Sequence, residues 1–438
     1  MTNPSSQNEP PVLQTHVTGP GLYAFLSNAV YKLDQRTYQL VWKHTFASDE
    51  AVQGDPRWSI APGQVLGARD ILYMGTHEKH LCVLNTADGS VLWRQWSARD
   101  LANSTAAYTL VESKTAQCST LTAYDEFTGK TLWQRQYPIV GSKIDSAFHS
   151  DGFRLITVTD QLLYAVVGYS QNGQGYFARY GLSPADGSIL WQNHEAVAGP
   201  ILNVEAHIVD GVIYTIEYGV KSVPPTLDSY GMTMTHLTEV RAVAYNLATG
   251  QQRWQTPSLI GEQPNGASFS TISKSILYFQ TFHERAPLPS TTTLHALSLS
   301  DGTLRWQYEQ KGGNLVGAAL QGESIYVETS RLEHVGAEQD FRIHVVALNA
   351  LTGEVRWSTP VKLLDGSERW QTREQQDHFG VVRVDMPPVV CAETVYYSTP
   401  ENRIYAIQSS DGKILAQFWV EKTAQTTVSS RVVLFVGP

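Results

Sequence analysis

The chain has 438 residues, of which 42% are hydrophobic and 17% charged, a composition typical of an ordered globular protein. Its formal net charge is −9 at pH 7, and because binding to nucleic-acid phosphates requires a Lys/Arg surplus, we expect no nucleic-acid partner. No stretch approaches about 18 consecutive apolar residues, so we also expect no direct membrane insertion.

The N-terminal segment 1–18 is polar and proline-rich, and we expect it to be disordered or extended, ahead of a single domain over 19–438. It has no basic n-region, no apolar h-region and no lipoprotein cysteine, which favours a cytoplasmic protein. A trimmed chain or a fragment would look the same, so the residues alone leave the compartment open.

One pattern then recurs along the chain: an alternating strand, a polar turn with glycine, and a second strand that ends in tryptophan. In every complete copy glycine precedes tryptophan by four positions, and successive copies are 40 to 63 residues apart. The first copy (31–42) has lost the glycine, and the eighth (405–416) has Ala416 in place of the tryptophan. The copies end at Trp42, Trp93, Trp133, Trp191, Trp254, Trp306 and Trp357.

Each copy predicts half of a four-stranded blade. Strand C leads into a turn in which glycine takes a positive φ, and strand D follows. Further strands lie upstream, as at 211–217, 275–281, 324–330 and 394–400, and short apolar segments such as 201–203 precede them. The fold class is therefore all-β: an eight-bladed β-propeller of four-stranded antiparallel blades, with seven blades as the alternative because two copies are degenerate.

The recurring tryptophans have a structural role in this interpretation. A large ring on the outer strand can wedge between neighbouring blades with its N–H bonded to a backbone carbonyl there. The first unit has only three evident strands, while a surplus strand lies at 430–436. Because an open sheet edge is a liability, we predict that this C-terminal strand pairs with the N-terminal blade and closes the ring.

The third copy carries a family resemblance, and it reads Ala123-x-Asp125-x-x-Thr128-Gly129-Lys130-x-x-Trp133. This resembles the tryptophan-docking motif of PQQ-like propellers, which include quinoprotein alcohol dehydrogenases and BamB-like proteins, and the resemblance covers about residues 20–420. The resemblance favours a periplasmic or extracellular protein. In the dehydrogenases it implies PQQ held over a disulfide between adjacent cysteines, with a metal ion and an aspartate base.

This sequence lacks those features. Its cysteines, Cys82, Cys118 and Cys391, stand far apart, and we interpret them as buried small hydrophobes. We therefore predict no catalytic, cofactor-binding or metal-binding residue and no cofactor. The 13 histidines, among them His77, His80 and His344, form no evident ligand set. Three carboxylates that could act as acids or bases are interpreted as solvated or turn-capping: Asp145, Glu217 and Asp385.

Loop lengths predict one decorated face. The B–C connections at 169–180, 218–239, 283–293 and 331–341 and the D–A connections at 46–63 and 362–381 are long, and all emerge on the same side. We expect a monomeric, non-catalytic scaffold that binds a protein or peptide partner there. The alternative is a sensor or oxidoreductase with a quinone or sugar-like ligand in the central funnel. Candidate contact residues are Tyr230, Arg285, Arg331, Trp370 and Arg373.

Overall fold

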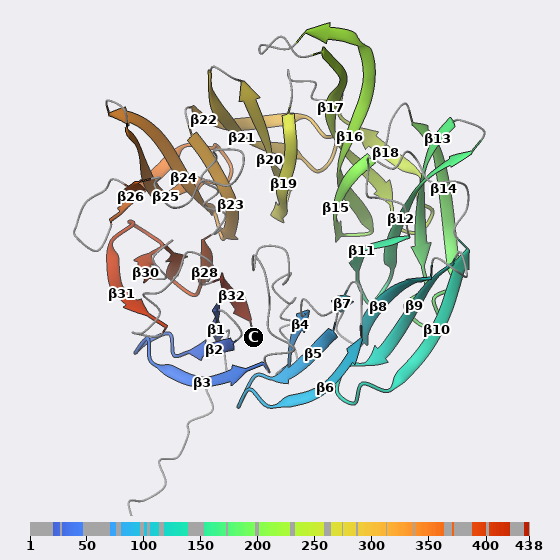
Figure 1. Cartoon of the computed structure of the whole chain (residues 1–438), viewed down its shortest axis with the longest axis horizontal. Helices are drawn as coiled ribbons and strands as arrows, with labels where there is room; N and C mark the ends of the chain where they lie inside the picture. The colour runs from blue at the N-terminus through green and yellow to red at the C-terminus, as the bar shows by residue number, and fades with distance from the viewer. Residues whose placement is uncertain are drawn as a thin grey trace, which may run out of the picture.

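The computed structural model is an eight-bladed β-propeller, as the repeat predicts (Figure 1). It describes residues 21–437 except 27–28, 47–70, 76–79, 97–99, 103–105, 114–117, 139–152, 172–173, 198–200, 228–232, 258–263, 274, 286–287, 312, 336–337, 363–369, 372–387, 400–402 and 421–432. Within these ranges no helix has the length and apolar character needed to cross a bilayer. The blades surround a central axis, with β15, β19 and β23 innermost and β6, β10 and β31 at the periphery.

All blades are antiparallel sheets, and chain order follows the ring. Blade 1 comprises β1 (Gly21–Leu26), β2 (Ala29–Leu33), β3 (Leu40–Thr45) and the C-terminal β32 (Val433–Gly437), and blade 2 comprises β4 (Ile71–Gly75), β5 (His80–Asn85) and β6 (Val91–Trp96). Blade 3 comprises β7 (Asp100–Ala102), β8 (Ala106–Ser113), β9 (Cys118–Asp125) and β10 (Thr131–Pro138). Blade 4 comprises β11 (Arg154–Val158), β12 (Leu163–Gln171), β13 (Gln174–Leu182) and β14 (Ile189–Val197). Blade 5 comprises β15 (Ile201–Val209), β16 (Val212–Leu227), β17 (Thr233–Asn246) and β18 (Gln252–Gln255), and blade 6 comprises β19 (Pro264–Ser273), β20 (Ile276–Arg285), β21 (Leu288–Ser298) and β22 (Leu304–Lys311). Blade 7 comprises β23 (Gly313–Gln321), β24 (Ser324–Val335), β25 (Glu338–Asn349) and β26 (Val355–Val361), and β27 (Trp370–Gln371) pairs with its β25. Blade 8 comprises β28 (Val389–Cys391), β29 (Thr394–Ser398), β30 (Arg403–Gln408) and β31 (Ile414–Trp419).

The C-terminal strand closes the ring. Strand β32 lies antiparallel to β1, with Leu22 opposite Val436 and Ala24 opposite Leu434. This is the pairing expected from the surplus strand, and it gives blade 1 its fourth, innermost strand. The first and last strands of the propeller therefore share one sheet, and β1 is paired on both of its edges.

The hydrophobic core is divided among the blade interfaces. Eight clusters of buried apolar side chains occur in the described part of the chain, and each joins two neighbouring blades, including blade 8 to blade 1. The cysteines Cys82, Cys118 and Cys391 are buried and free, as predicted. Because both faces of a blade are covered by its neighbours, no blade has a core of its own, and the ring must be stabilised as a whole.

Every interface from blade 1 through blade 8 carries the predicted tryptophan dock. Each indole N–H donates a hydrogen bond of 2.7–3.1 Å to a carbonyl oxygen in the C–D turn of the next blade. The bonds run from Trp42 to Thr86, Trp93 to Glu126, Trp133 to Pro184, Trp191 to Leu247, Trp254 to Leu299, Trp306 to Ala350 and Trp357 to Ser409.

The glycine of each complete turn is required by this contact. Gly129, at φ +64°, faces the ring of Trp93, and a Cβ placed there would lie 2.8 Å from two ring carbons. The turn itself is held by Asp125, whose carboxylate accepts hydrogen bonds from the backbone and hydroxyl of Thr128 at 2.8 and 2.7 Å. These hydrogen bonds lower the pKa of Asp125. One motif therefore fixes the turn and the docking surface together.

At the seam between blades 8 and 1, the two degenerate copies meet. Tyr38 occupies the glycine position of blade 1 at φ 59°, and Ala416 occupies the tryptophan position of blade 8. The Tyr38 ring stacks on Phe418, with centroids 4.8 Å apart and planes inclined by 18°. Both rings and Ala416 pack against the same buried cluster, so the large aromatic side chain is supplied by blade 1 instead of blade 8.

The dock predicts unequal effects of two glycine substitutions in blade 5. Gly250 and Gly211 both have positive φ, at +67° and +73°, but a Cβ at Gly250 would lie 2.4 Å from the Trp191 ring, whereas one at Gly211 would meet nothing within 4 Å. Gly211→Ala should cost only the backbone strain, roughly 1–2 kcal/mol. Gly250→Ala should cost about 1–3 kcal/mol more, because the ring must move. Urea unfolding midpoints measure both; equal losses would contradict the dock.

Ring closure predicts that removing the last strand destabilises the whole propeller. Deletion of residues 428–438 exposes the edge of β1 and removes Leu434, which is 7% exposed, from the seam core. We expect a strongly lowered melting temperature by differential scanning calorimetry. Deletion of the polar segment 1–18 is the control and should leave the melting temperature unchanged. If the C-terminal deletion does the same, closure by β32 is not required for stability.

Candidate functional site: the hairpin face

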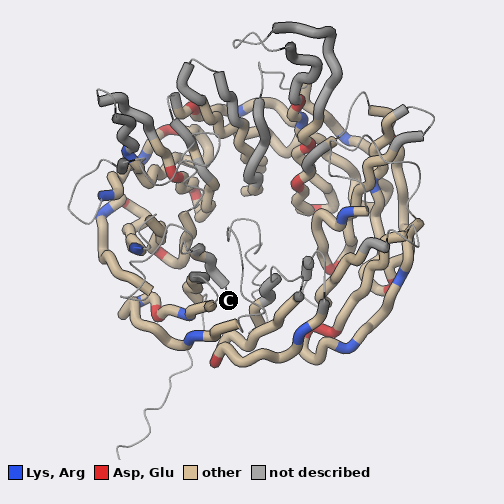
Figure 2. Tube along the Cα trace, viewed as in Figure 1, with Lys and Arg blue, Asp and Glu red and all other residues tan. Residues whose placement is uncertain are grey.

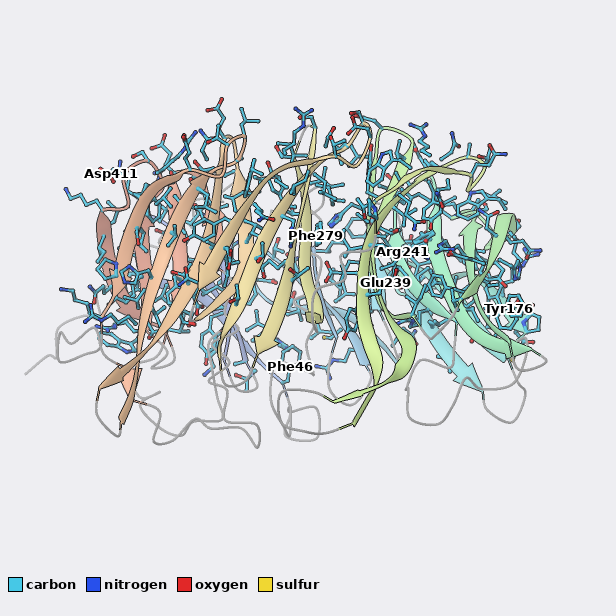
Figure 3. All side chains as sticks on the ribbon, turned by 90° about the horizontal axis from the view of Figure 1, so that it is seen from above. Phe46, Tyr176, Glu239, Arg241, Phe279 and Asp411 are labelled. Atoms are coloured by element: carbon cyan, nitrogen blue, oxygen red, sulfur yellow. The ribbon has the colours of Figure 1, made fainter. Side chains whose placement is uncertain are left out.

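Four consecutive hairpins, β12–β13, β16–β17, β20–β21 and β24–β25, reach one side of the propeller, and we call this side the hairpin face. Figure 3 shows hairpins projecting from the body on the side opposite the C–D turn that carries Asp411. Their strands have 9 to 16 residues, whereas β1, β2, β4 and β5 of blades 1 and 2 have 5 or 6. The long hairpins therefore belong to blades 4 to 7, which form one half of the ring.

The long B–C connections are strands, which corrects their interpretation as loops. In blade 5 the ladder runs to Leu227 opposite Thr233, so most of the segment 218–239 is paired. In blade 7 it runs to Val335 opposite Glu338. The segments 169–180 and 283–293 are likewise mostly paired. Antiparallel pairing satisfies the backbone groups, so these projections are ribbons with a defined direction.

The hairpins of blades 5 and 7 extend farthest beyond their own sheets, and we call these extensions arms. In blade 5, β15 pairs with β16 only as far as Gly219, and β18 pairs with β17 only from Val243 onward. In blade 7, β23 pairs with β24 as far as Arg331, and β26 pairs with β25 from Ile343 onward. Each arm is thus a two-stranded ribbon that leaves the four-stranded blade at a defined residue.

The blade 7 arm takes an additional strand from the connection to blade 8. Strand β27 pairs antiparallel with β25, with Trp370 opposite Phe341 and Gln371 opposite Asp340. Residues 370 and 371 of the connection to blade 8 are therefore paired with the arm through their backbone. This pairing demonstrates that the edge of an arm accepts an extended segment.

Three of the five candidate contact residues lie on this face by their backbone positions. Arg285 ends β20 opposite Leu288, Arg331 lies in β24, and Trp370 lies in β27. The structure does not describe the side chains of these three residues. Tyr230 and Arg373 lie outside the described residues.

A cluster of four charged side chains lies at the root of the blade 5 arm, between blades 4 and 5. Arg179 donates hydrogen bonds to Glu217 at 2.8–3.0 Å and to Glu195 at 2.8 Å. Arg241 donates to both oxygens of Glu195 at 2.9 Å and to Glu217 at 2.8 Å. Two arginines therefore alternate with two glutamates in a closed, neutral ring, which we call the ion cluster.

The ion cluster corrects the interpretation of Glu217 as solvated or turn-capping. Glu217 is 1% exposed, and its carboxylate also accepts a hydrogen bond from the hydroxyl of Tyr245 at 3.2 Å. The guanidinium of Arg179 lies over the rings of Phe177 and Tyr245, at 4.7 and 5.0 Å from their centroids. The other two carboxylates, at positions 145 and 385, lie outside the described residues.

Burial and charge act in opposite directions on the ion cluster. Burial alone would raise the pKa of Glu195, but the hydrogen bond from Arg241 and the positive charge of Arg179 outweigh it and lower that pKa. Burial alone would lower the pKa of Arg179, but the charge of Glu217 outweighs it and raises that pKa. The opposite charges of the arginines and glutamates therefore compensate the cost of removing these side chains from water.

The position of the ion cluster couples the blade 5 arm to its neighbour. Glu217 and Arg241 face each other across β16 and β17, and the arm begins two residues farther along, at Gly219 and Glu239. Figure 3 shows Glu239 and Arg241 on the projecting hairpin. Because their partners belong to β13 and β14, the arm root is fixed to blade 4 by charge-assisted hydrogen bonds.

The blade 4 hairpin is braced by aromatic side chains. Tyr169 stacks on Tyr176, with ring centroids 5.3 Å apart, and its hydroxyl lies 2.9 Å from Nδ1 of His194. The His194 ring also meets the edge of Tyr180 at 6.2 Å. Tyr169 is 7% exposed, and burial raises the pKa of its hydroxyl. The base of this hairpin is therefore packed and hydrogen-bonded.

The charged positions and the potential metal ligands of the described residues are dispersed over the propeller. Figure 2 shows acidic and basic positions interspersed around the ring. Among the residues that the structure describes, no three His, Cys, Asp or Glu side chains gather into a group that could hold a metal ion. His344 lies in β25, with Nδ1 3.0 Å from the hydroxyl of Ser358. His77 lies outside the described residues.

Comparison with known proteins gives a consistent family and fold. A family model described as outer membrane protein assembly factor BamB matches residues 26–194, 115–274 and 181–435. The apo form of AztD from Citrobacter koseri has a TM-score of 0.51 at 8% identity, over 96% of this chain and 99% of that chain. No curated protein matches the sequence.

Two further solved structures match most of this chain. BamB from Moraxella catarrhalis has a TM-score of 0.43 at 12% identity, over 85% of this chain and 95% of that chain. The quinohemoprotein alcohol dehydrogenase from Comamonas testosteroni has a TM-score of 0.48 at 11% identity, over 82% of this chain and 68% of that chain. At 8% identity the AztD structure indicates the propeller fold alone, and the family match rests on the sequence.

The lowered pKa of Glu195 predicts an acid-sensitive interface. A carboxylate whose pKa is depressed by folding stabilises the protein above its ordinary value of 4.5, and this contribution is lost as pH falls through the folded pKa. Glu195→Gln should lower stability at pH 7 by roughly 1–3 kcal/mol and flatten the decline of the melting temperature between about pH 5 and pH 3. The exposed Glu309→Gln on β22 is the control. Parallel pH profiles for wild type and Glu195→Gln would contradict this account.

Proposed function

We propose that this chain, which belongs to the family of the outer membrane protein assembly factor BamB, is a non-catalytic scaffold that binds a protein or peptide partner on its hairpin face. The observation that carries the proposal is the pair of two-stranded arms on one face, each projecting from a rigid blade. Function concentrates on segments held out by a rigid scaffold, and here those segments are ordered as ribbons.

The arms offer a partner both backbone and side-chain contacts. Beyond Val243 in blade 5, toward the hairpin tip, the edge of β17 continues for several residues outside its pairing with β18. A ribbon edge of this kind can take an extended peptide by strand addition, as the blade 7 arm takes β27. Main-chain hydrogen bonds would then supply affinity, and Arg285, Arg331 and Trp370 on the same face are the residue types favoured at contact hot spots.

The bases of the blade 4 and blade 5 hairpins are held in place by side-chain contacts, which favours a binding surface with a fixed shape. The ion cluster fixes the blade 5 arm to blade 4, and the aromatic packing of Tyr169 and Tyr176 fixes the hairpin of blade 4 itself. A pre-organised surface loses less conformational entropy on association, so a given contact area yields higher affinity. This is the property expected of a scaffold.

The family also favours a compartment and a class of partner. Its description as an outer membrane protein assembly factor favours a periplasmic location and a partner among the proteins that assemble the outer membrane. Fractionation of cells of the source organism, followed by immunoblotting, tests the location. Recovery in the cytoplasmic fraction alone would contradict it.

Shortening the blade 5 arm should abolish partner binding without unfolding the propeller. Replacing 221–237 by Asn-Gly joins the paired residues Val220 and Thr238 through a two-residue turn. We expect an unchanged melting temperature and loss of the partner captured by the immobilised wild-type chain. The matched control is Phe127→Ala, which removes an exposed ring from a C–D turn on the opposite face and should retain capture.

Single substitutions should then locate the contact. At least one of Tyr230→Ala, Arg285→Ala and Trp370→Ala should weaken binding by about 1 kcal/mol or more while the variant stays folded. Retention of every partner by all three variants and by the shortened arm would place the binding surface elsewhere. Calcium-dependent dye reduction by the chain reconstituted with PQQ would instead favour the oxidoreductase alternative.

A further inference from the structure

A polar pocket lies in the groove between blades 6 and 7. Its volume is about 330 Å³, and it is lined by Tyr308, Gln310, Thr329, Arg342, His344, Val346, Val355 and Ser358. Strand β22 forms one wall, and strands β24, β25 and β26 form the other. Arg342 and His344 place the pocket at the root of the blade 7 arm.

This pocket is the structural equivalent of the ion cluster, two blades farther around the ring. Glu195 and Gln310 each follow the docking tryptophan of their strand by four positions. Glu217 faces Arg241 across blade 5 as Thr329 faces His344 across blade 7. The two positions that hold carboxylates between blades 4 and 5 therefore hold an amide and a hydroxyl between blades 6 and 7.

Compared with the ion cluster, the pocket between blades 6 and 7 keeps some basic side chains but has no carboxylate at the two equivalent positions. The position of Arg241 is taken by His344, and that of Glu239 by Arg342, which exchanges a negative side chain for a positive one. Leu294 replaces the second arginine of the cluster. Among the lining residues that the structure describes, none is an aspartate or a glutamate.

We propose that this pocket binds the carboxylate of a ligand in the place that Glu195 fills between blades 4 and 5. The lining offers a guanidinium, an imidazole, an amide and three hydroxyls, of which the Ser358 hydroxyl lies 3.0 Å from Nδ1 of His344. Groups of these kinds can donate hydrogen bonds to a carboxylate. The aromatic ring of Tyr308 and the aliphatic side chain of Val346 offer an apolar wall for a short carbon stem. The volume suits a small dicarboxylic acid or one acidic side chain of a peptide.

The Gln310 position gives the sharpest test, because exchanging its amide nitrogen for an oxygen places a carboxylate at the position that Glu195 occupies in the ion cluster. Gln310→Glu supplies an internal carboxylate where Glu195 has one, and this carboxylate competes with any external one. Carboxylate binding in the pocket is measured on the chain without a partner at the hairpin face, so each proposal can fail alone.

Isothermal titration calorimetry of the full chain at pH 7 compares four probes. Glutarate is paired with neutral glutaramide, and a capped Gly-Glu-Gly peptide is paired with its Gly-Gln-Gly counterpart. We expect saturable binding of at least one carboxylate probe and none of its neutral counterpart. Binding of the peptide alone assigns the carboxylate to a protein side chain, and binding of glutarate alone assigns it to a free acid.

Three variants assign the binding to this pocket. Arg342→Gln and Gln310→Glu should each weaken it at least about tenfold, the loss expected when a charged hydrogen-bond partner is removed or blocked. Arg305→Gln, an exposed arginine on β22 outside the pocket, should bind like the wild type. The proposal is overturned if no carboxylate probe binds, or if Gln310→Glu, verified as folded by circular dichroism, binds as tightly as the wild type.

Discussion

The bond from an indole N–H to a carbonyl of the next blade is the interaction on which this propeller depends. Each such hydrogen bond contributes only about 0.5–1.5 kcal/mol net, but it comes with a large buried ring and a glycine shaped to receive it. Since each described core joins two blades, a shifted dock would misalign a whole interface. The dock therefore sets the offset of neighbouring sheets, and this offset determines which side chains meet between them.

The seam indicates that the constraint is the volume of the ring and not the identity of the residue. Seven interfaces pair a tryptophan with a glycine, whereas the eighth pairs Ala416 with Tyr38. A tyrosine at positive φ costs about 1–3 kcal/mol of backbone strain, which stacking on Phe418 and burial against the seam core offset. At the seam a small residue thus replaces tryptophan in blade 8 while a large residue replaces glycine in blade 1. The combined side-chain volume is roughly kept, and a packed interface tolerates volume-conserving exchanges.

Local sequence patterns predict the propeller, but they do not predict which side chains from different blades contact each other. Turn chemistry and alternation repeat in every blade, so eight copies reinforce each other. Glu217 was interpreted wrongly because Arg179, 38 residues away, belongs to another blade, and only the register of the dock brings them together. The sequence also predicts a loop over the blade 5 arm, whereas the structure has a strand there that contains Pro224 and Pro225. There the register with β17 shifts, on a ribbon with few partners to lose.

The interblade position below the dock is where this architecture can vary without losing the ring. Between blades 4 and 5 it holds four charges that neutralise each other, and between blades 6 and 7 it holds a polar pocket. Both sites lie at the root of an arm, and Arg342 belongs to the arm of blade 7 while it lines the pocket. A carboxylate bound there would brace that arm as Glu195 braces the arm of blade 5. By linkage, a partner that favours the braced arm would in turn tighten the pocket for its ligand.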